Sequence, residues 1–457
     1  MKRPKWKRLI CILCILFVMA GTSALATTLQ DAESSFLSDG GMEAHFTLAV
    51  SAFPSFGEKR LEDLNLLLRH ISLHAVQSGS LRQLSVDVDG EDAFRLLTEE
   101  TVDQTRTLLD LASSGRYVME GDPLTLWRPS GEETTISGET EELLHIWQTL
   151  EAGVSFFSWL PGLCPEEARI QKTNQKLRMG RATQSVSIQL PSETVKEGRV
   201  HELIEASAFP ELEWLLQGLS FRGKQKVQLL FDEEDRLLKA QYSGQAGREE
   251  KPLRNVRLEW KCLRNEKERK DELTLRTPAV DGSERNNWTM RRSWIQEENG
   301  TETFSFSGKV DRKGPDEKRV IEWDAQLSGA ETVTGRIVWS VTENRETRKT
   351  VLIPELTAEG EGNYRGTLEI LQYSGKILIT GIKLTGTVCD RTSLSWPASG
   401  DESGALEGKD AEEPALNRLI AGALVQRLLA LPTEDLRFLS AEIPEADWQQ
   451  ILDANKH

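Results

Sequence analysis

The sequence predicts an α+β protein, mainly an antiparallel β-meander that curves into a half-barrel-like sheet, with packed amphipathic helices and a C-terminal helical tail. Between about residues 224 and 388, apolar and polar residues alternate, as they do in antiparallel strands with one solvated face. Short turns separate these runs, which indicates a meander. Apolar residues spaced three and four apart mark only a few segments as helices.

The first 26 residues have the features of a secretory signal peptide. A basic segment, residues 1–8, precedes the uncharged apolar run Leu9–Ala20, and Ala24-Leu25-Ala26 fits a cleavage site. An uncleaved membrane anchor is the alternative, although the uncharged stretch is at the lower limit for a membrane span. We therefore expect a secreted or extracytoplasmic protein of the cell envelope, with a membrane as partner only through an uncleaved signal segment.

Residues 27–128 are expected to form an N-terminal α+β unit. The unit begins with a strand over residues 45–53 and a helix over residues 58–71, which carries one leucine-rich stripe. A strand over residues 84–91 then enters the Asp89-Gly90 turn. The remaining segments predict a second helix over residues 101–113 and a hairpin over residues 115–127.

A helical connector over residues 129–182 and a second α+β unit over residues 183–280 are predicted next. The second unit is a possible repeat of the first, because Leu64–Leu73 and Leu212–Phe221 align with four identical residues in ten. Two unrelated amphipathic helices explain the same likeness.

The C-terminal part begins with the antiparallel meander over residues 281–396. There Arg319–Leu327 and Thr332–Val341 each place apolar residues on one face. An acidic, glycine-rich linker over residues 397–414 precedes a helical tail over residues 415–457. The tail is expected to dock on its own sheet or on a partner protein.

The net charge bears on the class of partner, and the cysteine content bears on disulfide formation. The formal net charge of -16 argues against nucleic acid as a partner. After signal cleavage only Cys164, Cys262 and Cys389 remain. Cys262 and Cys389 are a possible disulfide, and three buried thiols are the alternative.

No catalytic residue, metal site or cofactor is predicted. His201-Glu202 begins like a zinc-protease helix, but Glu205 stands where the second histidine belongs. His70 and His74 have a spacing of four, but the predicted helix ends between them, so a shared metal is not expected. Asp87-Val88-Asp89-Gly90 fits a hairpin turn better than a calcium loop. The many acidic residues single out no carboxylate pair, so a secreted hydrolase with an unrecognised carboxylate site stays an alternative.

The candidate binding residues are apolar or aromatic and lie on the predicted strands. One group lies on the apolar strand faces and consists of Ile321, Trp323, Ile337 and Trp339. The second group lacks a clear apolar row and could, like Trp396, stack on sugars; it consists of Trp288 and Trp294. The leading hypothesis is a non-enzymatic binding protein that holds an apolar small molecule or an envelope protein on the curved sheet. A glycan-binding module and a scaffold that grips a partner with its tail helix are further alternatives.

Overall fold

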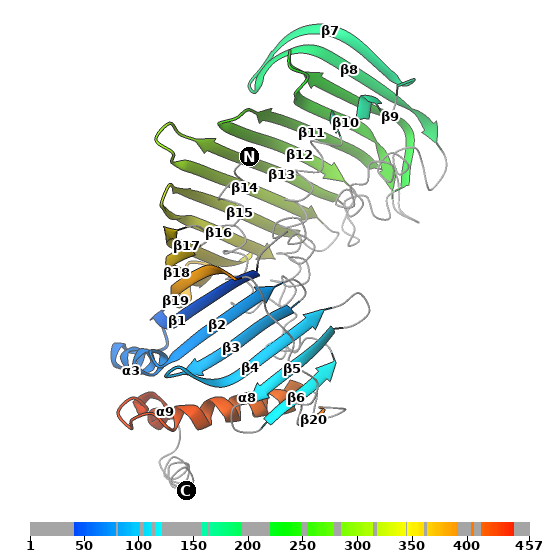
Figure 1. The fold of residues 1–457 in the computed structure, drawn as a ribbon. Coiled ribbons are helices and arrows are strands. Elements are labelled where there is room, and N and C mark those ends of the chain that lie inside the picture. Colours follow the sequence, from blue (N-terminus) through cyan, green and yellow to red (C-terminus); the bar gives the residue numbers. More distant parts are fainter. Residues whose placement is uncertain are drawn as a thin grey trace. The chain divides into compact units, whose positions relative to one another are not determined.

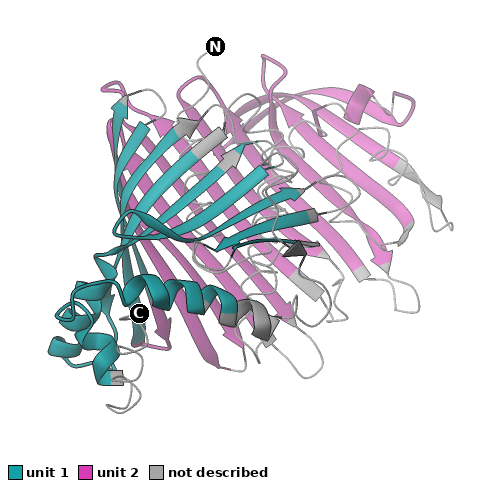
Figure 2. Ribbon diagram, turned by 60° about the horizontal axis from the view of Figure 1, so that its bottom comes forward, with its two compact units in different colours: residues 1–142, 355–371, 378–457 teal, residues 143–354, 372–377 magenta. Residues whose placement is uncertain are grey.

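The structure is a computed structural model and describes residues 41–78, 81–100, 105–111, 115–120, 157–158, 160–162, 165–193, 220–247, 254–277, 285–313, 318–343, 345–360, 363–391, 404–405 and 413–442. Its two compact units are discontinuous in sequence (Figure 2). Unit 1 comprises residues 1–142, 355–371 and 378–457, and unit 2 comprises residues 143–354 and 372–377. Strands β17 (Glu346–Gly360) and β18 (Asn363–Ser374) contribute residues to both units.

Unit 1 contains an antiparallel sheet. Its paired strands run in the order β6, β5, β4, β3, β2, β1, β19, and the short β20 pairs parallel with β6 (Figure 1). Their bounds are β1 Gly41–Ala52, β2 Ile71–Ser78, β3 Leu81–Val88, β4 Glu91–Glu100, β5 Thr105–Leu111, β6 Gly115–Glu120, β19 Ile377–Arg391 and β20 Gly404–Ala405.

Few helices accompany this sheet, so the broader prediction of packed amphipathic helices is not supported among the described residues. The described helices of the unit are α3 (Glu58–Leu68), α8 (Glu413–Leu428) and α9 (Arg437–Glu442). Side chains from α8, such as Ile420 and Ala423, share a buried cluster with Phe94 and Leu109 of the sheet. The guanidinium group of Arg427 also donates a hydrogen bond to the carbonyl of Asp92 on β4. The apolar face of unit 1 therefore packs against α8, which lies beside β3, β4 and β5 (Figure 1).

The first predicted strand and helix of unit 1 are confirmed as β1 and α3, although α3 ends at Leu68. The Asp-Gly turn after β3 is also confirmed. Asp89 and Gly90 have φ angles of 51° and 81°, the left-handed conformation that favours these residue types in tight hairpins.

The predicted helix over residues 101–113 is wrong, because Thr105–Leu111 forms strand β5. The leucines of this segment fit a helical period and a strand period equally well. Pairing with β4 decides the outcome: it buries Leu109 and Leu111, and the hydroxyl groups of Thr98 and Thr107 hydrogen-bond at 3.0 Å between the two strands.

The strands of unit 2 are also antiparallel, and each strand from β7 to β16 pairs with the next along the chain (Figure 1). The predicted meander is therefore confirmed. The bounds are β7 Ala168–Leu177, β8 Gly180–Glu193, β9 Ser220–Phe231, β10 Leu237–Gly247, β11 Arg254–Arg264, β12 Glu268–Thr277, β13 Arg285–Gln296, β14 Glu302–Lys313, β15 Lys318–Gly329 and β16 Thr332–Glu343.

The predicted helical connector is wrong over its last residues, because residues 168–182 belong to β7 and β8. Strand β7 is largely polar and exposed, so it lacks the apolar alternation that marks a strand in the sequence. Unit 2 also spans residue 280, the predicted boundary between the second α+β unit and the meander.

Several predictions fall outside the described residues. These are the signal peptide, most of the connector, the second copy of the possible repeat, the linker apart from residues 404–405, and the end of the tail. Among the described helices, none has the length and apolar character needed to cross a membrane.

Candidate functional site

The predicted binding residues share one side of the unit 2 sheet, which we call the tryptophan face. Strand register defines it through two neighbouring cross-strand rows. The first row contains Trp260, Leu273, Met290, Gly308, Trp323 and Trp339, and the second contains Leu258, Leu275, Trp288, Val310, Ile321 and Val341. Trp294 and Ile337 lie on the same side of β13 and β16, because strand side chains alternate with period two.

Most of the tryptophan face is buried. Trp288, Trp323 and Trp339 are 4, 5 and 7% exposed, and Ile321 is fully buried. Trp294 and Ile337 are half-buried, and the Arg269 guanidinium lies 5.6 Å from the Trp294 ring centre. The expectation that Trp288 lacks apolar neighbours and is open for sugar stacking is therefore wrong, since Leu275 and Val310 flank it in the register. Trp396 lies outside the described residues.

A short helical segment contacts the face. Phe157 lies edge-on to Trp260, with ring centres 6.3 Å apart and planes at 89°. This arrangement is a favourable one for two aromatic rings. Gly308 makes room for the Trp323 ring, because a β-carbon at Gly308 would lie 2.7 Å from Cε3 of Trp323.

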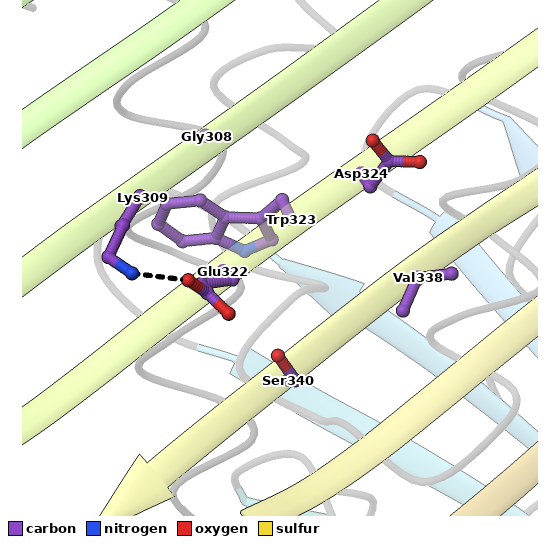
Figure 3. Close-up of a pocket in the computed structure, with 7 residues that line it drawn as sticks. All are labelled: Gly308, Lys309, Glu322, Trp323, Asp324, Val338 and Ser340. Carbon is purple, nitrogen blue, oxygen red and sulfur yellow. Dashed lines mark hydrogen bonds and ion pairs between the residues drawn. The ribbon is translucent and has the colours of Figure 1, made fainter.

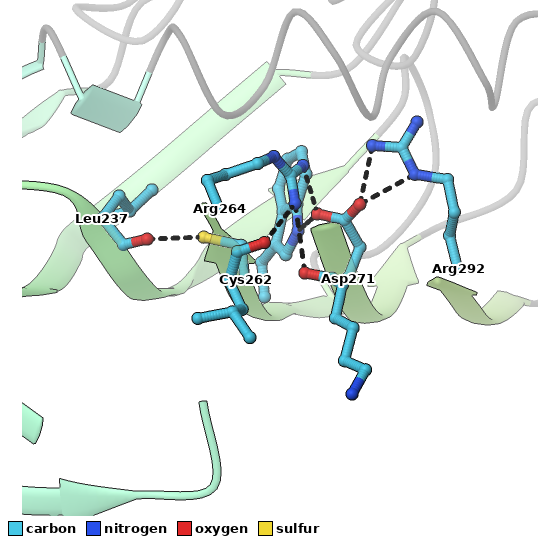
Figure 4. A network of polar contacts seen from close by, with 8 residues as sticks. Leu237, Cys262, Arg264, Asp271 and Arg292 are labelled. Carbon is cyan, nitrogen blue, oxygen red and sulfur yellow. Dashed lines mark hydrogen bonds and ion pairs between the residues drawn. The ribbon is translucent and has the colours of Figure 1, made fainter. Parts of the chain in front are cut away.

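A buried charge network interrupts the apolar character at one end of the tryptophan face (Figure 4). Asp271 is 2% exposed and Arg292 is 6% exposed. Asp271 Oδ2 accepts a hydrogen bond from Nε of Arg292 at 2.8 Å and forms an ion pair with its Nη2 at 2.6 Å. Its Oδ1 accepts from Nη2 of Arg264 at 2.6 Å and from Nε1 of Trp260 at 3.1 Å. Among the described residues, the guanidinium groups of Arg264 and Arg292 thus both contact the one carboxylate of Asp271.

Cationic groups also lie beyond the other end of the face. Arg312 and Arg319 are directly opposite one another on β14 and β15, two residues beyond Val310 and Ile321. Burial lowers the pKa of the Arg312 guanidinium. Burial also lowers the pKa of Arg319, although the neighbouring Glu343 carboxylate opposes this shift.

The opposite side of the same strands carries a shallow pocket of ≈ 300 Å³ (Figure 3). Its lining includes two carboxylates of β15, Glu322 and Asp324, together with Lys309 and Ser340. The ammonium group of Lys309 pairs with Glu322, and both side chains are about half exposed. The arrangement singles out no acid and base for hydrolysis, so it adds no support for an enzyme.

The predicted disulfide between Cys262 and Cys389 is not present in the structure. The Cys262 thiol is fully buried beneath β10 and donates a hydrogen bond to the Leu237 carbonyl at 2.8 Å. Burial raises the pKa of the Cys262 thiol to about 12. Cys262 therefore fits the alternative of a buried thiol, while Cys164 lies outside the described residues.

A second cluster, in unit 1, was not anticipated from the sequence. Glu43, His45 and His74 lie on neighbouring strands β1 and β2, and each offers a potential metal-ligand atom. His45 lies on β1, a predicted strand, and His74 lies on β2, a strand that was not predicted. Neither lies on a helix, so the four-residue spacing of His70 and His74 has no bearing on the cluster. The signal was hidden because α3 separates β1 from β2, and the sequence does not reveal their register.

Comparisons with known proteins identify no relative. No protein-family model and no curated protein matches the chain. Among solved structures, OmpT, an outer membrane protein of Vibrio cholerae, aligns with 77% of this chain and 95% of its own length, at 7% identity and a TM-score of 0.23. OprB of Pseudomonas putida aligns with 79% of this chain and 95% of its own, at 7% identity and a TM-score of 0.25. The anion-selective porin from Comamonas acidovorans aligns with 76 and 98% of the two chains, at 8% identity and a TM-score of 0.20. TM-scores this low do not establish a shared fold, and we base no conclusion on them.

Proposed function

We propose that the chain is an exported, non-enzymatic binding protein of the cell envelope whose tryptophan face holds an amphiphile with an acidic head group. The supporting observation is the Arg264–Asp271–Arg292 network beside the apolar rows of unit 2. The proposed location rests on the basic and apolar leader in residues 1–26.

The presence of two guanidinium groups in the network favours an anionic ligand group. Burying a charge is unfavourable unless it is paired, and here two guanidinium groups share one carboxylate. A ligand carboxylate or phosphate could accept bidentate hydrogen bonds from a guanidinium. The adjoining row of Trp260, Trp323 and Trp339 would contact the apolar part of the same ligand.

The burial of the face sets a condition for binding. Because Trp323 and Trp339 are nearly inaccessible, a ligand would enter only when the covered face opens locally. Slow binding and slow release are expected for this reason. The same burial argues against sugar stacking on Trp288, Trp323 and Trp339, since stacking needs an exposed ring.

Native and denaturing mass spectrometry of the protein purified from its exporting host tests this proposal. We expect a bound ligand that adds to the mass of the native protein, dissociates on denaturation and is extractable into organic solvent. Arg292→Met should reduce its occupancy. Arg178→Met is the matched control, because the Arg178 side chain is 79% exposed and lies outside the network. The proposal would be contradicted if the purified protein contains no such ligand and also binds no added oleate.

A further inference from the structure

The strand register of unit 1 brings three metal-ligating residue types together. His45 on β1 and His74 on β2 are directly opposite one another in the antiparallel ladder. Glu43 precedes His45 by two residues on β1, so its side chain points to the same side of the sheet. The three residues therefore form a compact triangle on two hydrogen-bonded strands.

Ring nitrogens of both histidines approach the same carboxylate oxygen. The imidazole rings of His45 and His74 are stacked, with centres 3.9 Å apart and planes at 11°. Oε1 of Glu43 lies 3.1 Å from Nε2 of His45 and 2.8 Å from Nε2 of His74. The three potential ligand atoms all lie within 4.8 Å of one another.

These distances are close to those of a first-row metal site. Zinc binds imidazole nitrogen and carboxylate oxygen at ~2.0–2.2 Å, which places neighbouring ligand atoms of a tetrahedral ion roughly 3.4 Å apart. To bind an ion, the two nitrogen–oxygen edges would lengthen by a few tenths of an ångström, and the stacked rings would turn so that both Nε2 lone pairs point at the ion. Three protein ligands would leave one position for water or another ligand.

The surroundings are favourable for a cation. Asp87 and Asp92 are near enough to act electrostatically on His45 and His74, respectively. Arg95 is the basic group that pairs with Asp92 in this region. Among these described residues, three carboxylates accompany one guanidinium group, that of Arg95. The cluster is also only partly buried, so an ion can reach it: Glu43 and His74 are half-buried and His45 is exposed.

We propose that Glu43, His45 and His74 bind a divalent first-row transition ion, with neutral histidine nitrogens and the glutamate carboxylate as ligands. Imidazole and carboxylate ligands suit Zn²⁺ well, and Co²⁺ occupies the same kind of site. The proposal concerns unit 1 and does not depend on ligand binding by the tryptophan face of unit 2.

Calorimetric titration of the full chain with ZnCl₂ tests the site directly, on protein made without a histidine tag and treated with a chelator. We expect one ion per chain. Glu43→Gln, His45→Gln and His74→Gln should each weaken binding by more than the ~10–100-fold that loss of a ligand's hydrogen-bonding partner causes. His70→Gln is the matched control, because His70 instead contacts Asp89 and Asp435.

Cobalt provides a second readout that does not depend on how the variants fold. Co²⁺ bound at the cluster should give an intense visible absorption, typical of a four-coordinate ion, that added Zn²⁺ abolishes. Circular dichroism would confirm that the variants keep the β-rich fold. The proposal is overturned if the wild-type chain binds no Zn²⁺, or if His45→Gln and His74→Gln bind it as tightly as wild type does.

Discussion

Asp271 and Arg292 face one another across β12 and β13, and two nitrogen atoms of Arg292 lie 2.6 and 2.8 Å from the same carboxylate oxygen. The Asp271 side chain is 1% exposed, and the adjoining positions of its strand face are Leu273 and Leu275. Forming a buried ion pair in such a setting requires both charged groups to lose their hydration, which is unfavourable in free energy. We therefore regard this pair as the best indication of what the tryptophan face binds.

Removing the carboxylate from this network should be more damaging than removing one guanidinium. Asp271→Ala removes the carboxylate that the buried Arg292 and the half-buried Arg264 both contact, and we expect a loss of ~3–5 kcal/mol in the free energy of unfolding. Arg292→Met should cost less, since Asp271 keeps its bonds to Arg264 and Trp260. Urea denaturation measures both. Glu322→Gln, in an exposed ion pair, is the control and should cost less than about 1 kcal/mol. An Asp271→Ala variant as stable as this control would contradict the account.

Gly308 and Trp323 should behave as a coupled pair. A β-carbon at Gly308 would lie 2.7 Å from the Trp323 ring, so Gly308→Ala should overpack the face and cost ~1–3 kcal/mol in the free energy of unfolding. Trp323→Phe removes the part of the ring that would collide. In the double variant the alanine should therefore cost less than it does alone. Simple additivity of the two single changes in urea denaturation would show that the close approach is not real.

The Cys262 thiol should be unreactive in the folded protein. Burial raises the pKa of this thiol to about 12, and its S–H group donates a hydrogen bond to the Leu237 carbonyl. Almost no thiolate is therefore present at pH 8. We expect peptide mapping after treatment with iodoacetamide to find Cys262 unmodified in native protein and alkylated in urea. Rapid alkylation under native conditions would mean that the thiol is accessible.

Asp87 should make stability depend on pH. Burial, followed by the hydrogen bond and the charge of Asp92, raises the pKa of Asp87 to about 6 from an ordinary value of 3.8. Between about pH 4 and pH 6 the folded state holds a proton that the unfolded state has released, so this group lowers the free energy of unfolding as pH rises.

Replacement of Asp87 by asparagine isolates this effect. Relative to wild type, Asp87→Asn should gain stability between about pH 4 and pH 6, and the difference should level off above pH 6. Urea denaturation at a series of pH values measures this difference, because other titrating groups cancel to first order. A difference that stays constant across this range would contradict the raised pKa.

The sequence predicts the meander well because its signal is local. The alternation of Ile321, Trp323 and Leu327 with charged residues is visible without any knowledge of neighbouring strands, and β15 forms as expected. Segment 105–111 shows the limit of the method. Its leucines satisfy two periods at once, and only pairing with β4 selects the strand.

The candidate sites depend on register, which the sequence does not contain. His45 and His74 meet because β1 and β2 pair on either side of α3, and no spacing rule connects them. Asp271 and Arg292 look like ordinary solvent-facing residues in the sequence, yet the register places both on the apolar side. Four of the predicted residues could be identified because they lie on clearly alternating strands: Ile321, Trp323, Ile337 and Trp339.

Quenching of tryptophan fluorescence by a fatty acid brominated in the middle of its chain tests the central claim most directly, because bromine quenches a ring only in near contact. We predict saturable quenching in the wild-type protein, a smaller effect from the unbrominated acid, weaker binding in Arg292→Met and unchanged binding in Arg178→Met. Quenching that does not saturate, or that is the same in Arg292→Met as in wild type, would contradict an acidic amphiphile on the tryptophan face.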